Sequence, residues 1–269
     1  MARTQRLSLG HIWRDSLTVF WGDWLDLRSR ITQVAASGLI SPLIYIVAFG
    51  LGLGSSINGS GGISPEYPNI SYLEFILPGM AALSAMAISF GGTTFSICGE
   101  RLFSKTFEEM LLLPVHPLSL HIGKIMAGIL RGLMTSGSVA LVAILFTQRL
   151  WSFLNPLFWL VLVLNCAVFA GIGVIAGLRV KSLESVGLYN NFLIVPMSFL
   201  GATFFDPSTL PGILKGVVYC LPLTYATTAL RAAAYRPLAD FPWLNLLVLG
   251  GLALLLCWAG AYQFSHQQD

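Results

Sequence analysis

The chain has 269 residues, of which 55% are hydrophobic and only 10% are charged, and its mean hydropathy is +0.76. Because about 25% of the residues of a soluble domain are usually charged, the polar side chains here are too few to cover a soluble globule. The formal net charge of +3 is small and forms no basic run, which argues against nucleic acid as a partner. The composition therefore indicates an integral membrane protein.

Charged residues interrupt residues 1–30, so this stretch has no continuous apolar run of the kind that signal peptides carry. Its apolar residues instead recur at spacings of three and four, while polar residues fall on the other face. This pattern predicts an amphipathic helix that lies in the membrane interface. An ordinary packing helix is the alternative. The apolar face comprises Leu9, Trp13, Leu17, Phe20, Trp24 and Leu27.

Six apolar runs follow, and each is about 20 residues or longer, the length that a helix needs to cross a bilayer. We therefore predict an all-α polytopic membrane protein whose two termini lie on the same side. Pro42 predicts a kink in the first span. The predicted spans are residues 31–53, 73–97, 118–146, 154–178, 186–205 and 243–264.

The distribution of lysine and arginine predicts which side the termini occupy. Cytoplasmic loops are enriched in these residues, so we expect both termini in the cytoplasm. With the N-terminus inside, ten basic residues are cytoplasmic and four are outside: Arg3, Arg6, Arg14, Arg28, Arg30, Arg101, Lys105, Lys124, Arg179 and Lys181, against Arg149, Lys215, Arg231 and Arg236.

The stretch 198–231 is too apolar for a loop and too broken to span. Asp206 and Pro207 end one apolar run, and Pro211 and Pro222 separate two pieces of about 10 residues each, half the length needed to cross. Such pieces are expected to enter the membrane and return, which requires cover by protein or by a water-filled cavity. We therefore predict re-entrant helices within residues 210–235, on the outer face, and place function at this rim.

The predicted loop between the second and third spans, residues 99–117, combines charged and apolar residues. Four consecutive apolar residues at 110–113 follow the charges, and Pro114 and Pro117 end the segment. A short helix here would present a charged end and an apolar knob to the cytoplasm, which suits docking into a groove on a soluble motor. A solvated loop would explain the charges but not the apolar run. The charged residues are Glu100, Arg101, Lys105, Glu108 and Glu109.

Polar residues inside the predicted spans are costly against lipid, so they are expected to face a partner helix, a dimer seam or a transport path. For the asparagines, hydrogen bonds between helices are at least as good an interpretation, and Arg131 could snorkel to the inner surface. Aromatic residues give the fifth span a large apolar face, either for packing or for the wall of a cavity at a dimer seam. The candidates for a path or seam are Arg131, Asn165, Tyr189, Asn190, Phe192 and Phe199.

The sequence predicts no catalytic, cofactor-binding or metal-binding set. The four cysteines and four histidines lack ligand spacing, and there is no H-E-x-x-H, G-x-S-x-G or G-x-x-x-x-G-K-[ST] motif. An intramembrane lipid-modifying enzyme is therefore disfavoured. An ion-coupled secondary transporter is disfavoured too, because all twelve acidic residues fall in predicted loops, interfaces or tails. Without a phosphate loop, ATP hydrolysis is expected in a separate subunit.

Four segments together resemble the type-2 ABC exporter permeases, a family that includes exporters of nodulation factors, drugs and polysaccharides. The resemblance covers nearly the whole chain, and its last segment is the most specific. The segments are the amphipathic N-terminal helix, YLEFILPG at 72–79, FEEML at 107–111 with Pro114 and Gly123-Lys124 beyond it, and the signature from Phe204-Phe205 through LPLTY at 221–225 to Arg231.

The resemblance implies a permease subunit that forms a homodimer, or pairs with a homologous permease, and recruits two copies of a separate ATPase that binds ATP and Mg. It implies a location in the cell inner membrane and export of an amphipathic substrate, such as a lipo-oligosaccharide, polysaccharide precursor, lipid or hydrophobic drug. Residues 103–113 would form the coupling helix, which contacts the ATPase next to the N-terminal helix. Residues 181–185 would make a second, smaller contact with the ATPase. The coupling residues would be Phe103, Phe107, Glu108, Glu109, Met110, Leu111 and Leu113, and the re-entrant gate Phe204, Phe205, Pro211, Pro222, Tyr225 and Arg231.

Overall fold

A computed structural model describes residues 9–53, 67, 70–112, 115–146 and 153–265 of the chain. This part of the chain is built of helices, turns and bends and contains no strand. Its long helices are α1 (Leu9–Ser29), α2 (Ile31–Tyr45), α4 (Tyr72–Gly99), α6 (Pro117–Phe146), α8 (Pro156–Arg179) and α13 (Trp243–Ser265).

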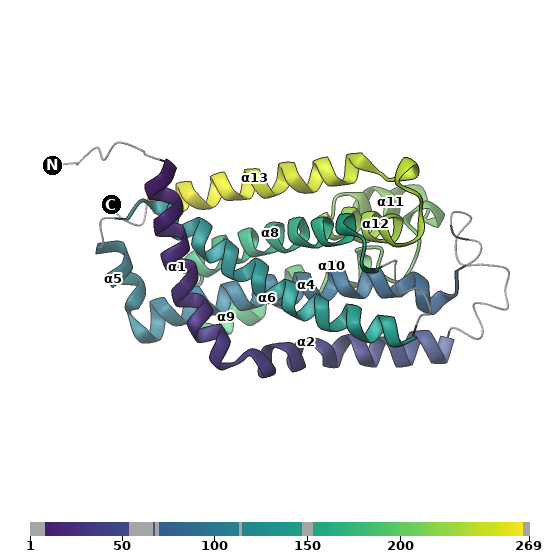
Figure 1. Ribbon diagram of the computed structural model, residues 1–269, viewed down its shortest axis with the longest axis horizontal. Coiled ribbons are helices and arrows are strands. Elements are labelled where there is room, and N and C mark those ends of the chain that lie inside the picture. The colour runs from purple at the N-terminus through teal and green to yellow at the C-terminus, as the bar shows by residue number, and fades with distance from the viewer. Residues whose placement is uncertain (1–8, 54–66, 68–69, 113–114, 147–152, 266–269) are drawn as a thin grey trace.

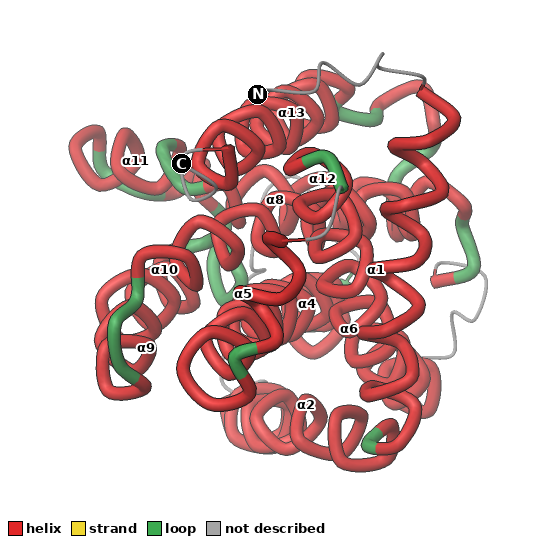
Figure 2. The backbone as a smooth tube through the Cα atoms, turned by 90° about the vertical axis from the view of Figure 1, so that its left-hand side faces the viewer, coloured by secondary structure: helices red, strands yellow, loops and turns green. Residues whose placement is uncertain are grey.

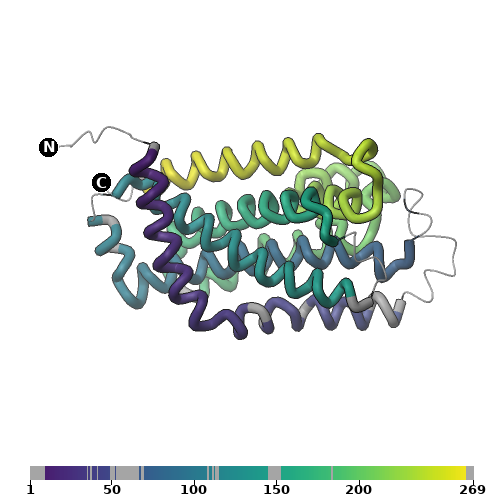
Figure 3. The backbone as a smooth tube through the Cα atoms, viewed as in Figure 1, coloured from purple at the N-terminus to yellow at the C-terminus, as the bar shows by residue number. Residues whose placement is uncertain are grey.

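Helix α1 lies across one end of a bundle in which α2, α4, α6, α8 and α13 run side by side (Figures 1 and 3). We call this the α1 end. The opposite end, which we call the hairpin end, carries α11 (Gly212–Tyr219) and α12 (Pro222–Tyr235). Seen along the bundle, α4, α6 and α8 lie towards the middle, while α2 and α13 lie on opposite sides (Figure 2). The two ends of the bundle are therefore built from different elements.

Five stretches are long and apolar enough to cross a membrane, and they correspond to the first, second, third, fourth and sixth predicted spans. The π-helices η1 (Ile46–Leu53) and η2 (Glu100–Ser104) extend α2 and α4, and the short helix α5 (Thr106–Leu112) follows η2. The predicted all-α polytopic fold is thereby confirmed. The five stretches are Ile31–Ala48, Tyr72–Ser104, Pro117–Ile144, Pro156–Arg179 and Trp243–Phe264.

The predicted fifth span, residues 186–205, is interrupted and ends early. It comprises α9 (Leu183–Tyr189), the π-helix η3 (Asn190–Ile194) and α10 (Val195–Leu200), and it is not among the five stretches above. The helix ends at Leu200 rather than at Phe205, because the chain bends through 201–205 and Ala202 adopts a left-handed φ of 59°. The carbonyls of Ala202 and Thr203 accept hydrogen bonds from Arg231 instead of continuing a helix.

Two short helices occupy the stretch in which the sequence predicts re-entrant pieces. Helices α11 and α12 meet at a bend of 89°, and counting them as one bent pair would raise the candidate spans to six. Pro211 directly precedes α11, and Pro222 is the first residue of α12, a position where its missing N–H costs no helical hydrogen bond. The 3-10 turns η4 (Pro207–Thr209) and η5 (Leu238–Asp240) flank the pair.

Helix α4 forms the centre of the bundle and packs against α6, α8 and α12. Small residues let these backbones approach closely, as in other membrane bundles. A Cβ on Gly173 of α8 would lie 2.7 Å from the carbonyl oxygen of Phe90. Asn165 of α8 donates from Nδ2 to the carbonyl oxygen of Ala82 at 3.0 Å. The helix that leads into η2 and α5 is therefore held firmly by the bundle.

Candidate functional site

Helix α1 crosses α6 at a position where only glycine fits. A Cβ on Gly123 would lie 2.7 Å from Cβ of Val19 and 2.9 Å from the carbonyl oxygen of Ser16. The inward side of α1 buries Ser16, Asp23 and Leu27. Its outward side exposes Trp13, Leu17, Trp21 and Leu25, as an amphipathic helix in a membrane interface would.

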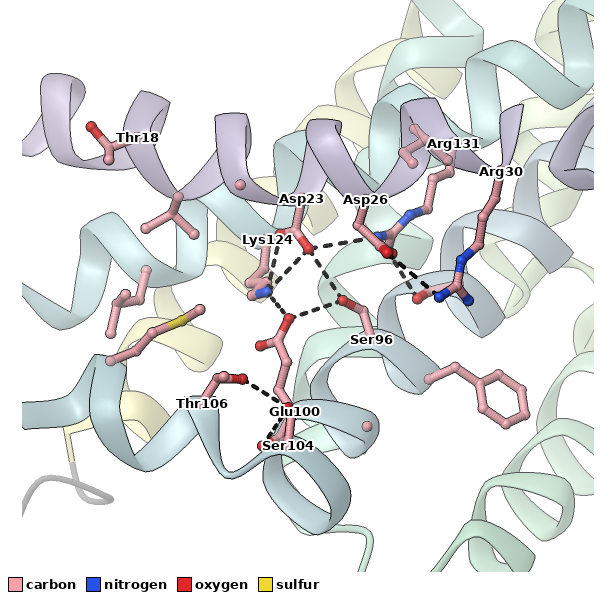
Figure 4. A pocket seen from close by; sticks show the side chains of 18 of the residues that line it. Thr18, Asp23, Asp26, Arg30, Ser96, Glu100, Ser104, Thr106, Lys124 and Arg131 are labelled. Carbon is pink, nitrogen blue, oxygen red and sulfur yellow. Dashed lines mark hydrogen bonds and ion pairs between the residues drawn. The ribbon is translucent and has the colours of Figure 1, made fainter. Parts of the chain in front are cut away.

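Four charged side chains meet where α1, α6 and the end of α4 converge (Figure 4). The Lys124 ammonium lies 3.0 Å from Oδ2 of Asp23 and also pairs with Oε1 of Glu100. Nη2 of Arg131 lies 3.5 Å from Oδ1 of Asp23, and the Ser96 hydroxyl lies 3.2 Å from a carboxylate oxygen of each acid. Two acids balance two bases, which suits burial. We call these four charged residues the ion network.

The ion network identifies the partner of Arg131. The sequence predicts that this residue faces a partner helix, a dimer seam or a transport path, or snorkels to the inner surface; the structure pairs it with Asp23 of α1, another helix of the same chain. The sequence does contain a signal. Asp23 follows Phe20 by three residues and precedes Leu27 by four, so it lies on the same side of α1 as the apolar Leu27. A carboxylate on that face needs a buried partner.

A cavity of about 990 Å³ adjoins the ion network (Figure 4). Residues of α1, α2, α4, η2, α5 and α6 line it, so it lies between the interface helix and the predicted coupling segment. Arg131 also donates from Nη1 to the carbonyl oxygen of Gly92 at 3.0 Å, which fixes its guanidinium at the wall. The cavity therefore combines fixed charges with apolar side chains.

The predicted coupling segment, residues 103–113, divides into two parts. Phe103 lies in η2 and is 68% exposed. Lys105 has a left-handed φ of 56° and interrupts the helix, so α5 begins only at Thr106. Glu109 is exposed and Met110 lines the cavity. The side chains of Glu108 and Leu111 and the whole of Leu113 lie outside the described part of the chain.

Phe107 belongs to the packing of the bundle rather than to an exposed surface. It is 5% exposed, and its ring centroid lies 5.9 Å from that of Phe264 at the end of α13. Next to it, Arg101 donates to the carbonyl oxygens of Gly177, Leu178 and Val180 at 2.5 to 3.2 Å. These contacts anchor α5 and η2 to the ends of α8 and α13.

At the hairpin end, Arg231 is the most deeply buried charge, with 2% of its surface exposed. It donates to the carbonyl oxygens of Phe75 at 3.0 Å, Thr203 at 2.9 Å and Ala202, and its guanidinium lies 3.7 Å from the centroid of the Phe75 ring. Arg231 thus ties α12 to the start of α4 and to the bend after α10.

The other predicted gate residues surround this anchor. The Tyr72 hydroxyl donates to the Phe204 carbonyl at 3.2 Å, and the Tyr225 hydroxyl donates to the Tyr219 carbonyl at 2.7 Å, across the bend between α11 and α12. Phe205 is partly buried. The structure therefore brings Phe204, Tyr225 and Arg231 to the hairpin end.

The predicted path or seam residues separate into an inward and an outward group. Asn165 and Arg131 are buried, and each donates a hydrogen bond to a backbone carbonyl of α4. For Asn165, this is the interhelical hydrogen bonding that the sequence offers as an alternative. The four candidates on the fifth span are exposed, and Phe192 is 81% exposed. The outward group, which we call the α9–α10 face, is Tyr189, Asn190, Phe192 and Phe199.

Comparison with known proteins matches the family model for ABC-2 type transporters to residues 15–235. The chain is 25% identical to the inner membrane transport permease YadH of Escherichia coli (strain K12) over 257 residues, 93% of this chain and 95% of that protein. It is 29% identical to nodulation protein J of Neorhizobium galegae over 224 residues, 81% and 79% of the two chains. Nodulation protein J of Rhizobium meliloti (strain 1021) is 28% identical over 216 residues, 80% and 79% of the two chains. The chain belongs to the ABC-2 type transporter family and is a permease of that family.

Proposed function

We propose that this permease is the membrane subunit of an ATP-driven exporter that moves an amphiphile across the inner membrane. Two copies, or one copy and a homologous permease, would form the membrane part, and two copies of a separate ATPase would bind ATP and Mg and supply the energy. The absence of a phosphate loop from the sequence supports a separate ATPase. The substrate class would be a lipo-oligosaccharide, polysaccharide precursor, lipid or hydrophobic drug.

The observation that carries this proposal is the exposed tip of α5. Leu112 is 87% exposed and Glu109 is exposed beside it, at the α1 end, while the base of the helix is anchored through Phe107. An apolar tip on an anchored helix is suited to insertion into a groove on a partner. We place the ATPase at this tip and on α1, and both termini in the cytoplasm.

A force on α5 would reach the membrane helices through contacts that are already made. Arg101 connects the segment to the end of α8, and Glu100 connects it through Lys124 to α6 and α1. Closure of two ATPase copies would then move α5, α8 and α6 together and rearrange the two membrane subunits. Such coupling requires a continuous set of packed and bonded groups, and these residues provide one.

Ion-coupled transport is the second candidate, since Asp23 and Glu100 are carboxylates at the α1 end of the bundle. An ion-binding carboxylate must exchange its proton or cation during transport. Both acids here are paired with Lys124, and Asp23 also with Arg131, which disfavours exchange. ATP dependence distinguishes the two candidates.

The experiment is reconstitution of the permease in lipid with a candidate P-loop ATPase from the same genome, followed by measurement of ATP hydrolysis with and without candidate amphiphiles. We expect the permease to raise the hydrolysis rate, and Glu109→Ala with Leu112→Ala to remove that effect. Asp240→Ala is the matched control, because Asp240 is an exposed acid at the hairpin end. Transport that persists without any ATPase would overturn the proposal in favour of ion coupling.

A further inference from the structure

The cavity at the α1 end has a charged part and an apolar part. Asp23, Glu100 and Lys124 line the first, whereas Val34, Ile88 and Phe95 line the second. Ile88 of α4 precedes Glu100 of η2 by 12 residues, and η2 continues α4. Ile88 and Glu100 are therefore roughly 18 Å apart along the helix axis. The volume of about 990 Å³ is in the range of pockets that hold organic ligands. Shape and chemistry both suit an amphiphile.

The charges of the cavity favour one kind of head group. Among the described residues that line it, the three basic side chains already have carboxylate partners. Lys124 pairs with Asp23 and Glu100, Arg131 with Asp23, and Arg30 with Asp26 at 3.6 Å. Asp15 is a fourth acid on the lining, so acids outnumber bases there. An anionic head group would therefore meet no unpaired cation and would add to the surplus of negative charge.

Hydrogen-bond acceptors are also in excess in the cavity. Oε2 of Glu100 is buried and accepts no hydrogen bond within the described part of the chain, although Oε1 is paired with Lys124. A buried carboxylate oxygen without a donor is costly, and a ligand that carries N–H groups would remove that cost. An ammonium group offers up to three donors and a positive charge.

From these observations we propose that the cavity binds an amphiphile with an ammonium head group. The head group lies against Glu100 and Asp23, and the apolar part lies beside Val34, Ile88 and Phe95. The ligand comes either from the membrane, as an ethanolamine lipid, or from the transported cargo, as a cationic amphiphile. The site is a property of the folded chain and does not depend on the proposed ATP-driven export.

Two glycines of the cavity provide variants that fill it without changing a residue of the ion network. Gly22 of α1 and Gly99 of α4 line the cavity, and a Cβ on either would meet no atom within 4 Å. Gly22→Leu and Gly99→Leu should therefore fold and place a side chain into the cavity. Gly91→Leu is the matched control, because Gly91 lies on α4, has the same open surroundings and does not line the cavity.

The test is native mass spectrometry of the purified permease, without any ATPase, after exchange into mixed phosphatidylethanolamine, phosphatidylcholine and phosphatidylglycerol. We expect the ethanolamine lipid to be retained roughly tenfold better than the choline lipid, which lacks N–H donors, and better still than the anionic glycerol lipid. Gly22→Leu and Gly99→Leu should abolish this preference, and Gly91→Leu should keep it. Glu100→Gln should weaken it.

Dodecylamine added as a competitor distinguishes the two sources. If dodecylamine displaces the lipid and stimulates the reconstituted ATPase, the natural ligand is transported cargo. If it displaces the lipid without stimulation, the ligand is a resident lipid. Both outcomes support the ammonium site. Retention of the glycerol lipid at least as strong as that of the ethanolamine lipid would overturn it. If Gly91→Leu and Gly99→Leu lost the preference for the ethanolamine lipid equally, the lipid site could not be assigned to this cavity. A permease that fails to stimulate any ATPase yet shows the lipid preference would contradict only the proposed export.

Discussion

Lys124 is the residue on which the ion network depends, because it pairs with both Asp23 and Glu100 while almost fully buried. We expect Lys124→Met to leave two carboxylates without that partner and to cost about 3 to 5 kcal/mol of stability. The measurement is the midpoint of thermal unfolding of the purified protein in detergent. Lys105→Met is the control, because Lys105 is exposed, and equal midpoints for the two variants would contradict the prediction.

The pairing of Lys124 with Glu100 predicts that the two substitutions are not additive. Glu100→Gln keeps the shape of the side chain but removes one of the charges that Lys124 neutralises. Combined with Lys124→Met, it should therefore recover part of the lost stability, with a coupling of about 1 to 3 kcal/mol. The same unfolding midpoints give this coupling, and strictly additive losses would show that the two side chains do not interact.

Arg231 holds the hairpin end through the geometry of its guanidinium as much as through its charge. Lysine would keep the charge, but one ammonium cannot reach the carbonyls of Phe75, Ala202 and Thr203 together. Because a hydrogen bond to a charged group contributes about 1.5 to 3 kcal/mol, we expect Arg231→Lys to lose about 3 kcal/mol of stability. Arg28→Lys, at an exposed position of α1, should leave the unfolding midpoint unchanged.

At the scale of elements, the crossing of α1 over α6 depends on Gly123. A Cβ there would press against Val19 and the backbone of Ser16, so Gly123→Ala should lift α1 away from the bundle. We expect trypsin to cleave after Arg28 and Arg30 several-fold faster in this variant. Gly22→Ala is the control, since its Cβ would meet nothing within 4 Å. Unchanged cleavage would mean that α6 accommodates the methyl group.

How far the sequence predicts each element follows from what determines its ends. Long apolar runs predict five spans closely, because burial in lipid depends on length and composition alone. The fifth ends early because a side chain 29 residues away in the sequence, that of Arg231, takes the carbonyl of Ala202. The ion network likewise depends on α1 crossing α6, and the periodicity of residues within one helix does not predict which other helix it crosses. Local patterns therefore predict the spans, whereas long-range contacts determine the site.

For the whole molecule, the described part of one copy contains two separate cavities, one near each end. The cavity at the α1 end and a smaller one of about 230 Å³ at the hairpin end, beside Arg231, share no lining residue in the described part of the chain. Arg231 and the residues bonded to it close the bundle near the second cavity. A route is therefore expected between two copies, along the exposed α9–α10 face.

This expectation predicts that Phe192 contributes to dimer formation. Its ring is 81% exposed in one copy, and removal of an aromatic anchor from an interface typically weakens association about tenfold or more. We expect Phe192→Ala to lower the dimer fraction in light scattering or mild cross-linking of the purified protein. Leu254→Ala removes a similarly exposed apolar side chain, 75% exposed, from α13, which is a separate helix from α9 and α10, and should leave the dimer intact. If Leu254→Ala dissociates the dimer and Phe192→Ala does not, the seam lies along α13, and the route between two copies has to be sought there.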